Sequence, residues 1–110
     1  MIFRNAAQNA RFAPDKMGKA SLAGGKHLYS GLNCFEPGQE HKAHTHADQD
    51  KLYVVLQGSG IATVGEEVSP VEVGDVVLAG AGVIHGMRNP GPERLVVLVV
   101  FSPPPAGFGN

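Results

Sequence analysis

The sequence has one cysteine, no tryptophan and no long apolar run. Cys34 is alone, so no intrachain disulfide can form and no cysteine-based zinc site can be built. The longest apolar run, residues 95–101, is far shorter than the roughly 20 residues that span a bilayer. The first residues also lack the unbroken apolar core of a signal peptide. These absences predict a protein of the reducing cytoplasm with no membrane segment.

The chain also has no large excess of positive or negative charge. Nine basic and ten acidic residues give a formal net charge of −1, which removes the electrostatic attraction that non-specific nucleic-acid binding needs. The same balance leaves nothing to hold the chain on an acidic membrane surface. With 110 residues, 43% of them hydrophobic and 17% charged, the chain is expected to form one globular domain.

Short strand-like runs separated by turn residues make up most of the sequence. Fifteen glycines and eight prolines break it, and no stretch repeats its apolar residues at the helical period. The pattern predicts an all-β sandwich or barrel over residues 26–103, preceded by a weakly patterned N-terminal arm, residues 1–25, and followed by a flexible tail, residues 104–110. The strands are expected at residues 27–36, 40–46, 51–57, 60–64, 68–73, 75–79, 84–88 and 94–101.

Three histidines carry the chemical signal. His44 and His46 are two residues apart in a predicted strand, so both side chains should face the same side of the sheet. His85 follows about forty residues later at the start of another strand. Three imidazoles that converge from two strands can chelate a divalent metal such as zinc, iron, nickel or copper.

Two motifs resemble those of the cupin superfamily of small β-barrels. The first family motif, G-(X)5-H-X-H-(X)3–4-E-(X)6-G, aligns with residues 38–58, which contain His44 and His46. The second, G-(X)5-P-X-G-(X)2-H-(X)3-N, aligns with residues 74–89, which contain His85 and end at Asn89. The two motifs are 15 residues apart, as in compact microbial members, and the resemblance covers roughly residues 27–102.

The resemblance implies a cupin-type jelly-roll β-barrel with one divalent transition metal, which could be iron, zinc, nickel, manganese or copper. It also implies a homodimer, to which a strand from residues 1–25 and the strand at 94–101 would contribute. One departure is serious, because Lys51 stands at the position of the family's glutamate ligand. An ammonium group has no lone pair for a metal and is repelled by it. A proline of the second motif is replaced by Gly80, which removes no ligand.

Three arrangements of the site are therefore open. In the first, His44, His46 and His85 bind the metal alone, as in the cupin-fold thiol dioxygenases, which also lack the glutamate. In the second, Asp50 or Gln49 supplies a fourth ligand, and for Asp50 this needs a one-residue bulge at the start of its strand. In the third, Lys51 replaces the charge of the metal and the pocket binds an anionic ligand.

The sequence also predicts roles for other side chains near the three histidines. Tyr53 shares the inward phase of Lys51, so these two residues are the candidates for orienting or protonating a substrate. Met87 and Val55 are expected in the pocket wall. His41 is out of phase with the inward side chains and is expected to be exposed. The remaining expectations are structural: a buried apolar role for Cys34, a turn-holding role for Asn89 and surface exposure for His27.

The sequence thus favours a metal-dependent enzyme that acts on a small molecule in the barrel, by dioxygenase, isomerase or lyase chemistry. The alternative is a non-catalytic cupin that binds a small molecule or a metal, as a sensor or a biosynthetic accessory. The fold alone does not decide between these functions, because one fold serves many reactions.

Overall fold

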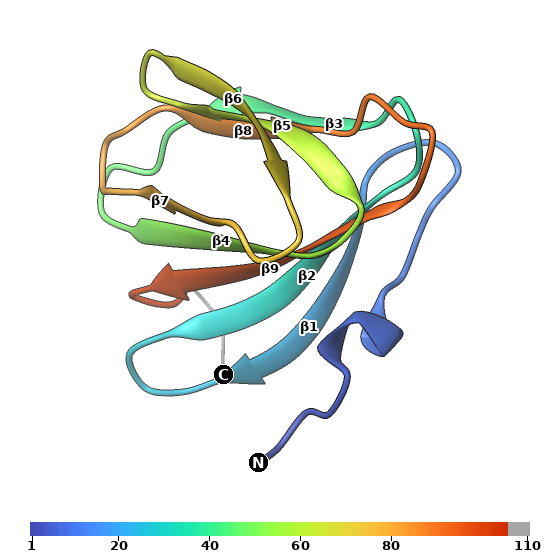
Figure 1. Ribbon diagram of the computed structural model, residues 1–110. Coiled ribbons are helices and arrows are strands. Elements are labelled where there is room, and N and C mark those ends of the chain that lie inside the picture. Colours follow the sequence, from blue (N-terminus) through green and yellow to red (C-terminus); the bar gives the residue numbers. More distant parts are fainter. Residues whose placement is uncertain (106–110) are drawn as a thin grey trace.

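Two antiparallel β-sheets face each other in the computed structural model, which describes residues 1–105 (Figure 1). The expected all-β fold is confirmed. A short 3-10 helix, η1 (Ala6–Asn9), precedes nine strands. Their bounds are β1 (Gly18–Gly24), β2 (Tyr29–Phe35), β3 (Glu40–His44), β4 (Asp50–Gln57), β5 (Ser59–Val64), β6 (Glu67–Glu72), β7 (Val76–Ala79), β8 (His85–Arg88) and β9 (Leu95–Ser102).

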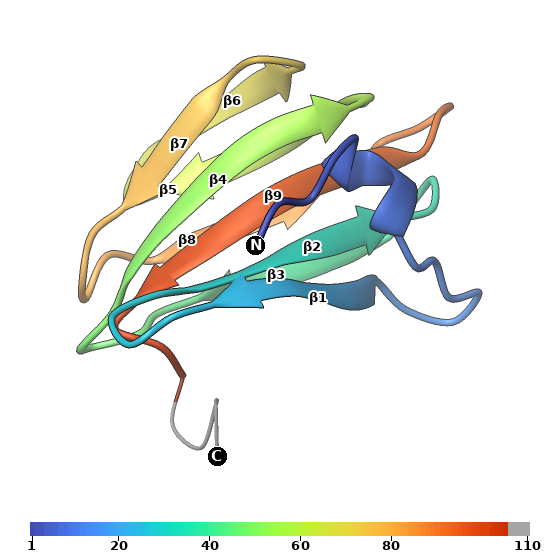
Figure 2. The same ribbon diagram turned by 90° about the horizontal axis from the view of Figure 1, so that it is seen from below.

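The larger sheet has the strand order β1-β2-β9-β4-β7, which Figure 2 shows from below. Its central strand, β9, has the continuous apolar sequence of residues 95–101 and pairs with β2 on one side and β4 on the other. This strand is therefore not an open edge of the sheet, and its contribution to a homodimer stays a prediction. The open edges of this sheet belong to β1 and β7.

The smaller sheet has the order β3-β8-β5-β6. Its strands β3 and β8 carry the histidines, and their register shifts between His41 and His44. His41 pairs with Met87 and His44 pairs with His85, so three steps along β3 match two steps along β8. The extra residue in this β-bulge reverses which face of the sheet the later side chains of β3 point to. His41 and His44, three residues apart, therefore point to the same face.

Apolar side chains from both sheets fill the space between them. Phe35, Tyr53 and Leu95 are fully buried in this core, together with Val55, Ala62, Val71, Met87, Val97 and Val99. Alternation along the strands explains the set, because every second side chain of a strand faces inward. In β4, for example, Lys51, Tyr53 and Val55 are buried and the residues between them are partly exposed.

The N-terminal arm covers the outer face of the larger sheet. Leu32, Cys34 and Val96 form a second buried cluster with Ala20, against which Ala7, Ala10 and Phe12 of the arm pack. Cys34 is fully buried and unpaired, as expected, and burial raises the pKa of its thiol. The family resemblance implied a strand in residues 1–25, as part of a dimer interface, and β1 is a strand of this arm that pairs with β2 of the same chain. The residues themselves did not locate it, since its glycines and alanines give only a short apolar alternation.

The turn before β9 depends on the side chain of Asn89, which is 1% exposed. Its Nδ2 donates to the carbonyl oxygens of Phe35 at 3.1 Å and Glu93 at 2.8 Å. Its Oδ1 accepts from the backbone N–H of Gly91 at 2.8 Å. The expected turn-holding role of Asn89 is confirmed, because three backbone groups depend on one buried amide.

Other sequence expectations have simple outcomes. His27 is exposed, as expected. Most of the predicted tail, residues 106–110, lies outside the described residues. Across residues 1–105, no helix is long and apolar enough to cross a membrane.

Candidate metal centre

His44, His46 and His85 come together at one end of the barrel. Each offers one ring nitrogen, and these nitrogens all lie within 4.8 Å of one another. His44 ends β3, His85 begins β8, and the two residues are direct partners across the sheet. His46 lies just beyond β3 rather than within a strand, so the predicted strand over residues 40–46 ends two residues early. The backbone N–H of Gly82 donates to the carbonyl of His46 at 2.9 Å and ties this segment to the loop before β8.

Hydrogen bonds fix the tautomer of two of these rings. The Nδ1 of His44 lies 2.6 Å from the carbonyl oxygen of Lys42, and the Nδ1 of His85 lies 2.9 Å from that of Val83. A carbonyl oxygen only accepts, so each Nδ1 carries the hydrogen and donates it. The Nε2 of a neutral ring then holds a lone pair, and both Nε2 atoms are buried without a partner. Two unpaired buried acceptors beside a third imidazole fit the donor set of a metal site.

The surroundings of His46 and His85 favour the neutral form of these two rings, which is the form that binds metals. Burial lowers the pKa of His46, and the nearby His44 and Lys51 lower it further. Burial also lowers the pKa of His85, against the opposing effect of its hydrogen bond to Val83. Metal binding needs deprotonated imidazole, so the donor set fits a divalent transition metal.

Lys51 is buried beside the histidines. Its side chain is 1% exposed, and its Nζ lies 4.7 Å from the centre of the Tyr53 ring and 4.9 Å from that of Phe101. Burial lowers the pKa of this amine to about 8, and Lys19 acts in the same direction. The residue that replaces the family's glutamate thus faces the pocket, as the strand register predicts.

The structure does not bring Asp50 to the histidines. Pairing between β4 and β9 is regular from Asp50 to Val55, so the bulge that an inward Asp50 would need is absent. The carboxylate is exposed, and its Oδ1 accepts from the N–H of Ala81 at 2.9 Å. Gln49 lines the pocket, and its Nε2 donates to the carbonyl of Pro103 at 3.0 Å. Neither residue completes a fourth ligand position in this arrangement.

Three expected pocket residues lie deeper than the pocket wall. Tyr53, Met87 and Val55 all belong to the core, and none of them lines the cavity beside the histidines. The hydroxyl of Tyr53 is buried without a hydrogen-bond partner, and burial raises its pKa. Its ring lies 6.1 Å from that of His85, measured between centres. Tyr53 therefore lies beneath the histidines, whereas Lys51 reaches the cavity.

His41 belongs to the site, and the expectation that it is exposed is wrong. Its ring centre lies 4.3 Å from that of His44, it lines the same cavity, and its Nδ1 is buried without a partner. Burial, with Lys51 and the neighbouring histidines, lowers its pKa to about 3. Strict alternation placed His41 on the opposite face from His44. The bulge between them reverses that phase, and nothing in the residues marks it.

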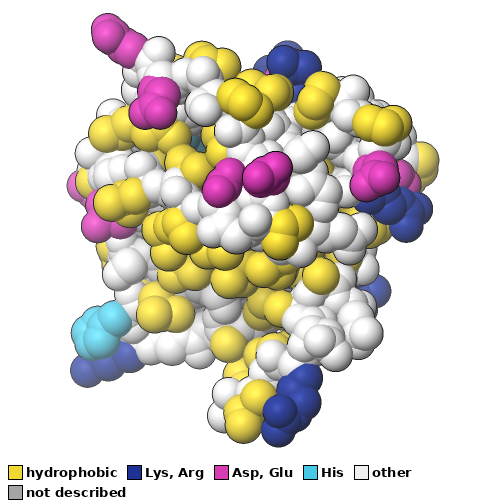
Figure 3. Space-filling model, viewed as in Figure 1, with side chains coloured by type: hydrophobic (Ala, Val, Ile, Leu, Met, Phe, Trp, Pro, Cys, Tyr) yellow, Lys and Arg dark blue, Asp and Glu magenta, His cyan; other side chains and the backbone are white. Residues whose placement is uncertain are grey.

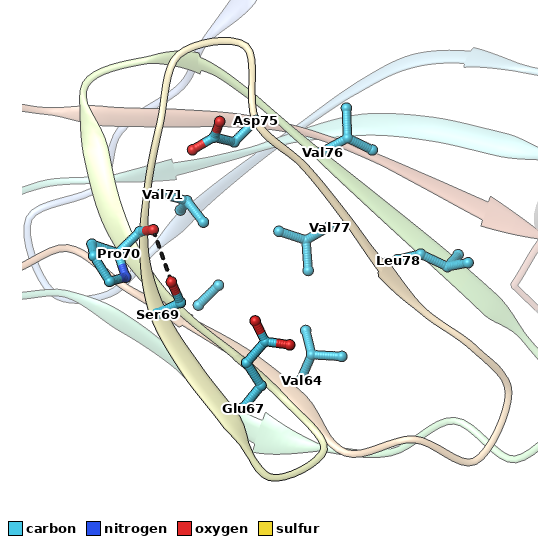
Figure 4. Close-up of a pocket in the computed structure, with 10 residues that line it drawn as sticks. Val64, Glu67, Ser69, Pro70, Val71, Asp75, Val76, Val77 and Leu78 are labelled. Atoms are coloured by element: carbon cyan, nitrogen blue, oxygen red, sulfur yellow. Dashed lines mark hydrogen bonds between the residues drawn. The ribbon is translucent and has the colours of Figure 1, made fainter.

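The histidine cavity has a volume of about 430 Å³ and opens between the edge strands β1 and β3. A second cavity, of about 350 Å³, lies on the other open side, between β6 and β7 (Figure 4). Its walls are mainly valines, with Glu67 and Asp75 as the charged members and no histidine or lysine. Apolar side chains also gather on the face of the molecule that Figure 3 shows. Val68, Val73, Val76 and Leu78 are among the exposed apolar side chains. Of these two cavities, only the first has histidines in its lining, namely His41, His44 and His46.

Comparison with known sequences points to one family. The family model described as "Cupin domain" matches residues 31–101. Auxin-binding protein 1 of Arabidopsis thaliana is 31% identical over 93 residues, which is 76% of this chain and 46% of that protein. The chain therefore spans less than half the length of this curated relative.

Solved structures show the same architecture. The protein TT1209 from Thermus thermophilus matches with a TM-score of 0.90 and 34% identity, over 96% of this chain and 100% of that chain. An uncharacterized conserved protein with a double-stranded β-helix domain, from Klebsiella pneumoniae, matches with a TM-score of 0.85 and 25% identity, over 96% and 92%. The expected jelly-roll barrel, or double-stranded β-helix, is confirmed.

Proposed function

The chain belongs to the cupin family, as its two motifs predict, and from this premise we propose that it is a metal-dependent enzyme acting on a small molecule. His44, His46 and His85 would hold one divalent ion of iron, zinc, nickel, manganese or copper. The observation that carries the proposal is the pair of buried, unpartnered Nε2 atoms of His44 and His85 beside His46. Such an ion would act as a Lewis acid on a substrate oxygen or activate O2.

The chain's own residues supply binding and orientation. Backbone carbonyls hold the rings of His44 and His85, so their orientation does not depend on other side chains. Lys51 is the polar group that can orient a substrate or transfer a proton to it, because its amine reaches the cavity and its pKa of about 8 is close to neutrality. Tyr53 is a positioning residue in this proposal, since it lies under His85 and outside the cavity lining. The reducing cytoplasm, where Cys34 would stay a free thiol, is the proposed location.

A non-catalytic cupin is the second candidate, and the replacement of the family's glutamate by Lys51 favours it. Within residues 1–105, no aspartate or glutamate lines the histidine cavity, so none of these side chains is available there as a carboxylate general base. Auxin-binding protein 1, a relative by sequence, is itself named for binding a small molecule.

Elemental analysis of the purified protein tests the metal centre. We expect about one equivalent of a transition metal in the wild type and in His27→Ala, the matched control, whose side chain is exposed and outside the site. The double variant His44→Ala, His85→Ala should lose the metal. No metal in the wild type, even after reconstitution, would contradict the proposal.

Oxygen uptake by the iron-loaded protein, screened with a panel of small molecules, then separates the two candidates. Turnover with any member of the panel supports an enzyme. Ligand binding without turnover for any loaded metal supports the non-catalytic candidate.

A further inference from the structure

Among the described residues, the side chains that line the histidine cavity include cations and no carboxylate. Lys19 and Lys51 line it together with the imidazoles of His41, His44 and His46, and no aspartate or glutamate is among its lining residues. The rest of the wall is largely apolar, with Val99 and Phe101 among its members.

Lys51 lacks a counter-charge from the protein. Among residues 1–105, the one ion pair within 4.0 Å joins Arg94 to Glu36, far along the chain from Lys51. The rings of Tyr53 and Phe101 near its Nζ offer only a cation–π attraction. Taking an ammonium out of water costs several kcal/mol unless an opposite charge meets it. This cost makes Lys51 an unusual residue to keep in the barrel for packing alone.

The acidic residues closest to Lys51 in sequence do not neutralise it. Asp50 is exposed and accepts a hydrogen bond from the N–H of Ala81, and Asp48 is exposed in the turn before β4. Among residues 1–105 no carboxylate compensates Lys51, and a molecule that enters the cavity can supply the negative charge.

We propose that Lys51 anchors the carboxylate of a small organic acid, whose apolar body lies against Val99 and Phe101, and that this acid and the metal bind cooperatively. The inference rests on the proposed metal centre and names the class of molecule that the site takes. A carboxylate has one negative charge to match the single buried ammonium. Inorganic phosphate has more charge and no apolar part to use the walls.

The cooperativity follows from the charges. Three neutral imidazoles leave the charge of a divalent ion uncompensated, and the ammonium of Lys51 adds a further positive charge in the same cavity. A carboxylate between them attracts both, so it should strengthen metal binding. Thermodynamic linkage then requires the metal to strengthen binding of the acid by the same factor.

Zinc affinity, measured by competition with a chelating dye, tests this coupling. The probes are acetate, isobutyrate and benzoate, each compared with its neutral amide, and inorganic phosphate. In the wild type we expect at least one of the acids to tighten zinc binding by about tenfold, within the usual range of coupling between sites, and the amides to have no effect.

Lys51→Met is the decisive variant. Without any acid it should bind zinc more tightly than the wild type, because the repelling ammonium is gone, and the acids should no longer tighten zinc binding. A purely structural role for Lys51 would not produce these two opposite changes. Lys26→Met, which removes an exposed lysine outside the cavity, should behave like the wild type.

Three results would contradict the proposed role of Lys51 as a carboxylate anchor: no acid changes the zinc affinity of the wild type, the effect persists in Lys51→Met, or phosphate acts as strongly as the best acid.

Calorimetric titration of the acids into metal-free protein separates this inference from the metal centre. If zinc does not bind but the acids bind to the wild type and not to Lys51→Met, the anchor stands without the metal. If zinc binds and the acids have no effect, the metal centre stands without the anchor.

Discussion

At the scale of single residues, the buried amine of Lys51 sets the electrostatics of the barrel. It replaces a carboxylate ligand with a cation and lies in a wall that has no acidic member. Its pKa in the folded protein, about 8, lies below the ordinary value of a lysine because burial disfavours the charged form. The protein therefore keeps a group that costs stability, as is common at functional sites.

The stability of the metal-free protein should depend on pH through Lys51. Below pH 8 the amine is charged in both states, so the full cost of burying it is present. Between about pH 8 and 10 the unfolded chain binds more protons than the folded one, so the free energy of unfolding rises with pH. Lys51→Met removes the charge and should raise the free energy of unfolding at pH 7 by up to about 3 kcal/mol.

Urea unfolding of both proteins from pH 7 to 10 measures this difference. The advantage of Lys51→Met should shrink steadily across the window, because the folded wild type loses its buried charge as the pH rises. Ionisation of Tyr53 affects both proteins alike and cancels in the comparison. An advantage that stays constant with pH would contradict a buried, charged Lys51.

Some residues of the candidate site could be identified from the sequence and others could not. His44, His46 and His85 could be found because two motifs fix their spacing, and the structure brings them together. His41 could not, since its inward position depends on a bulge that leaves no mark in residue type. Asp50 was a candidate only under a bulge that β4 lacks. The predictions for His41 and Asp50 failed because they depended on where β-bulges occur in β3 and β4, and residue type does not reveal a bulge.

At the scale of elements, the close contact between β3 and β8 positions the histidines. Gly86 follows His85, and a Cβ added at Gly86 would lie 2.9 Å from the carbonyl oxygen of His41 and 3.0 Å from the backbone of Ala43. Those backbone atoms belong to the bulged part of β3. The absence of a side chain at Gly86 thus allows the approach that places His41 and His44 against His85.

Gly86→Ala should therefore push β3 away from β8. We expect it to lower the free energy of unfolding by about 1–3 kcal/mol, as overpacking does, and to weaken metal binding, because His44 would move relative to His85. Gly25→Ala is the matched control, since a Cβ at that exposed turn would meet nothing within 4 Å. Urea unfolding and zinc titration of both variants check the prediction. Equal zinc affinity in the two variants would contradict a positioning role for the β3–β8 contact.

The elements themselves were largely predictable. Eight of the nine strands correspond to the apolar runs expected from the sequence, with ends that differ by at most two residues. The exception is β1, where Gly18, Ala20, Ala23 and Gly24 leave little apolar alternation to detect. Pairing with β2 and cover from the arm stabilise this strand, and both are contacts between distant parts of the chain.

At the scale of the whole molecule, the two sheets leave two open sides, and the histidine cluster lies on the side between β1 and β3. The strand β1 forms the edge of that side and pairs only with β2. Its other edge is a row of unpaired backbone groups, which proteins usually cover. Met1, Ile2 and Phe3 of the same arm are exposed.

We therefore expect the arm, residues 1–25, to take part in a homodimer. Light scattering coupled to size-exclusion chromatography should give twice the mass of the chain for the wild type. The double variant Ile2→Asp, Phe3→Asp should shift the protein toward monomer, because charges would replace exposed apolar groups at the interface. A wild type that remains monomeric at high micromolar concentration would contradict this expectation.

The most direct test of the metal centre is a crystal structure of the metal-loaded protein with anomalous diffraction data collected at the absorption edge of the bound metal. The account predicts one strong anomalous peak within about 2.0–2.3 Å of one ring nitrogen each from His44, His46 and His85, with no Asp50 oxygen in contact. A peak held by other residues, or no peak in fully loaded crystals, would contradict a three-histidine metal centre.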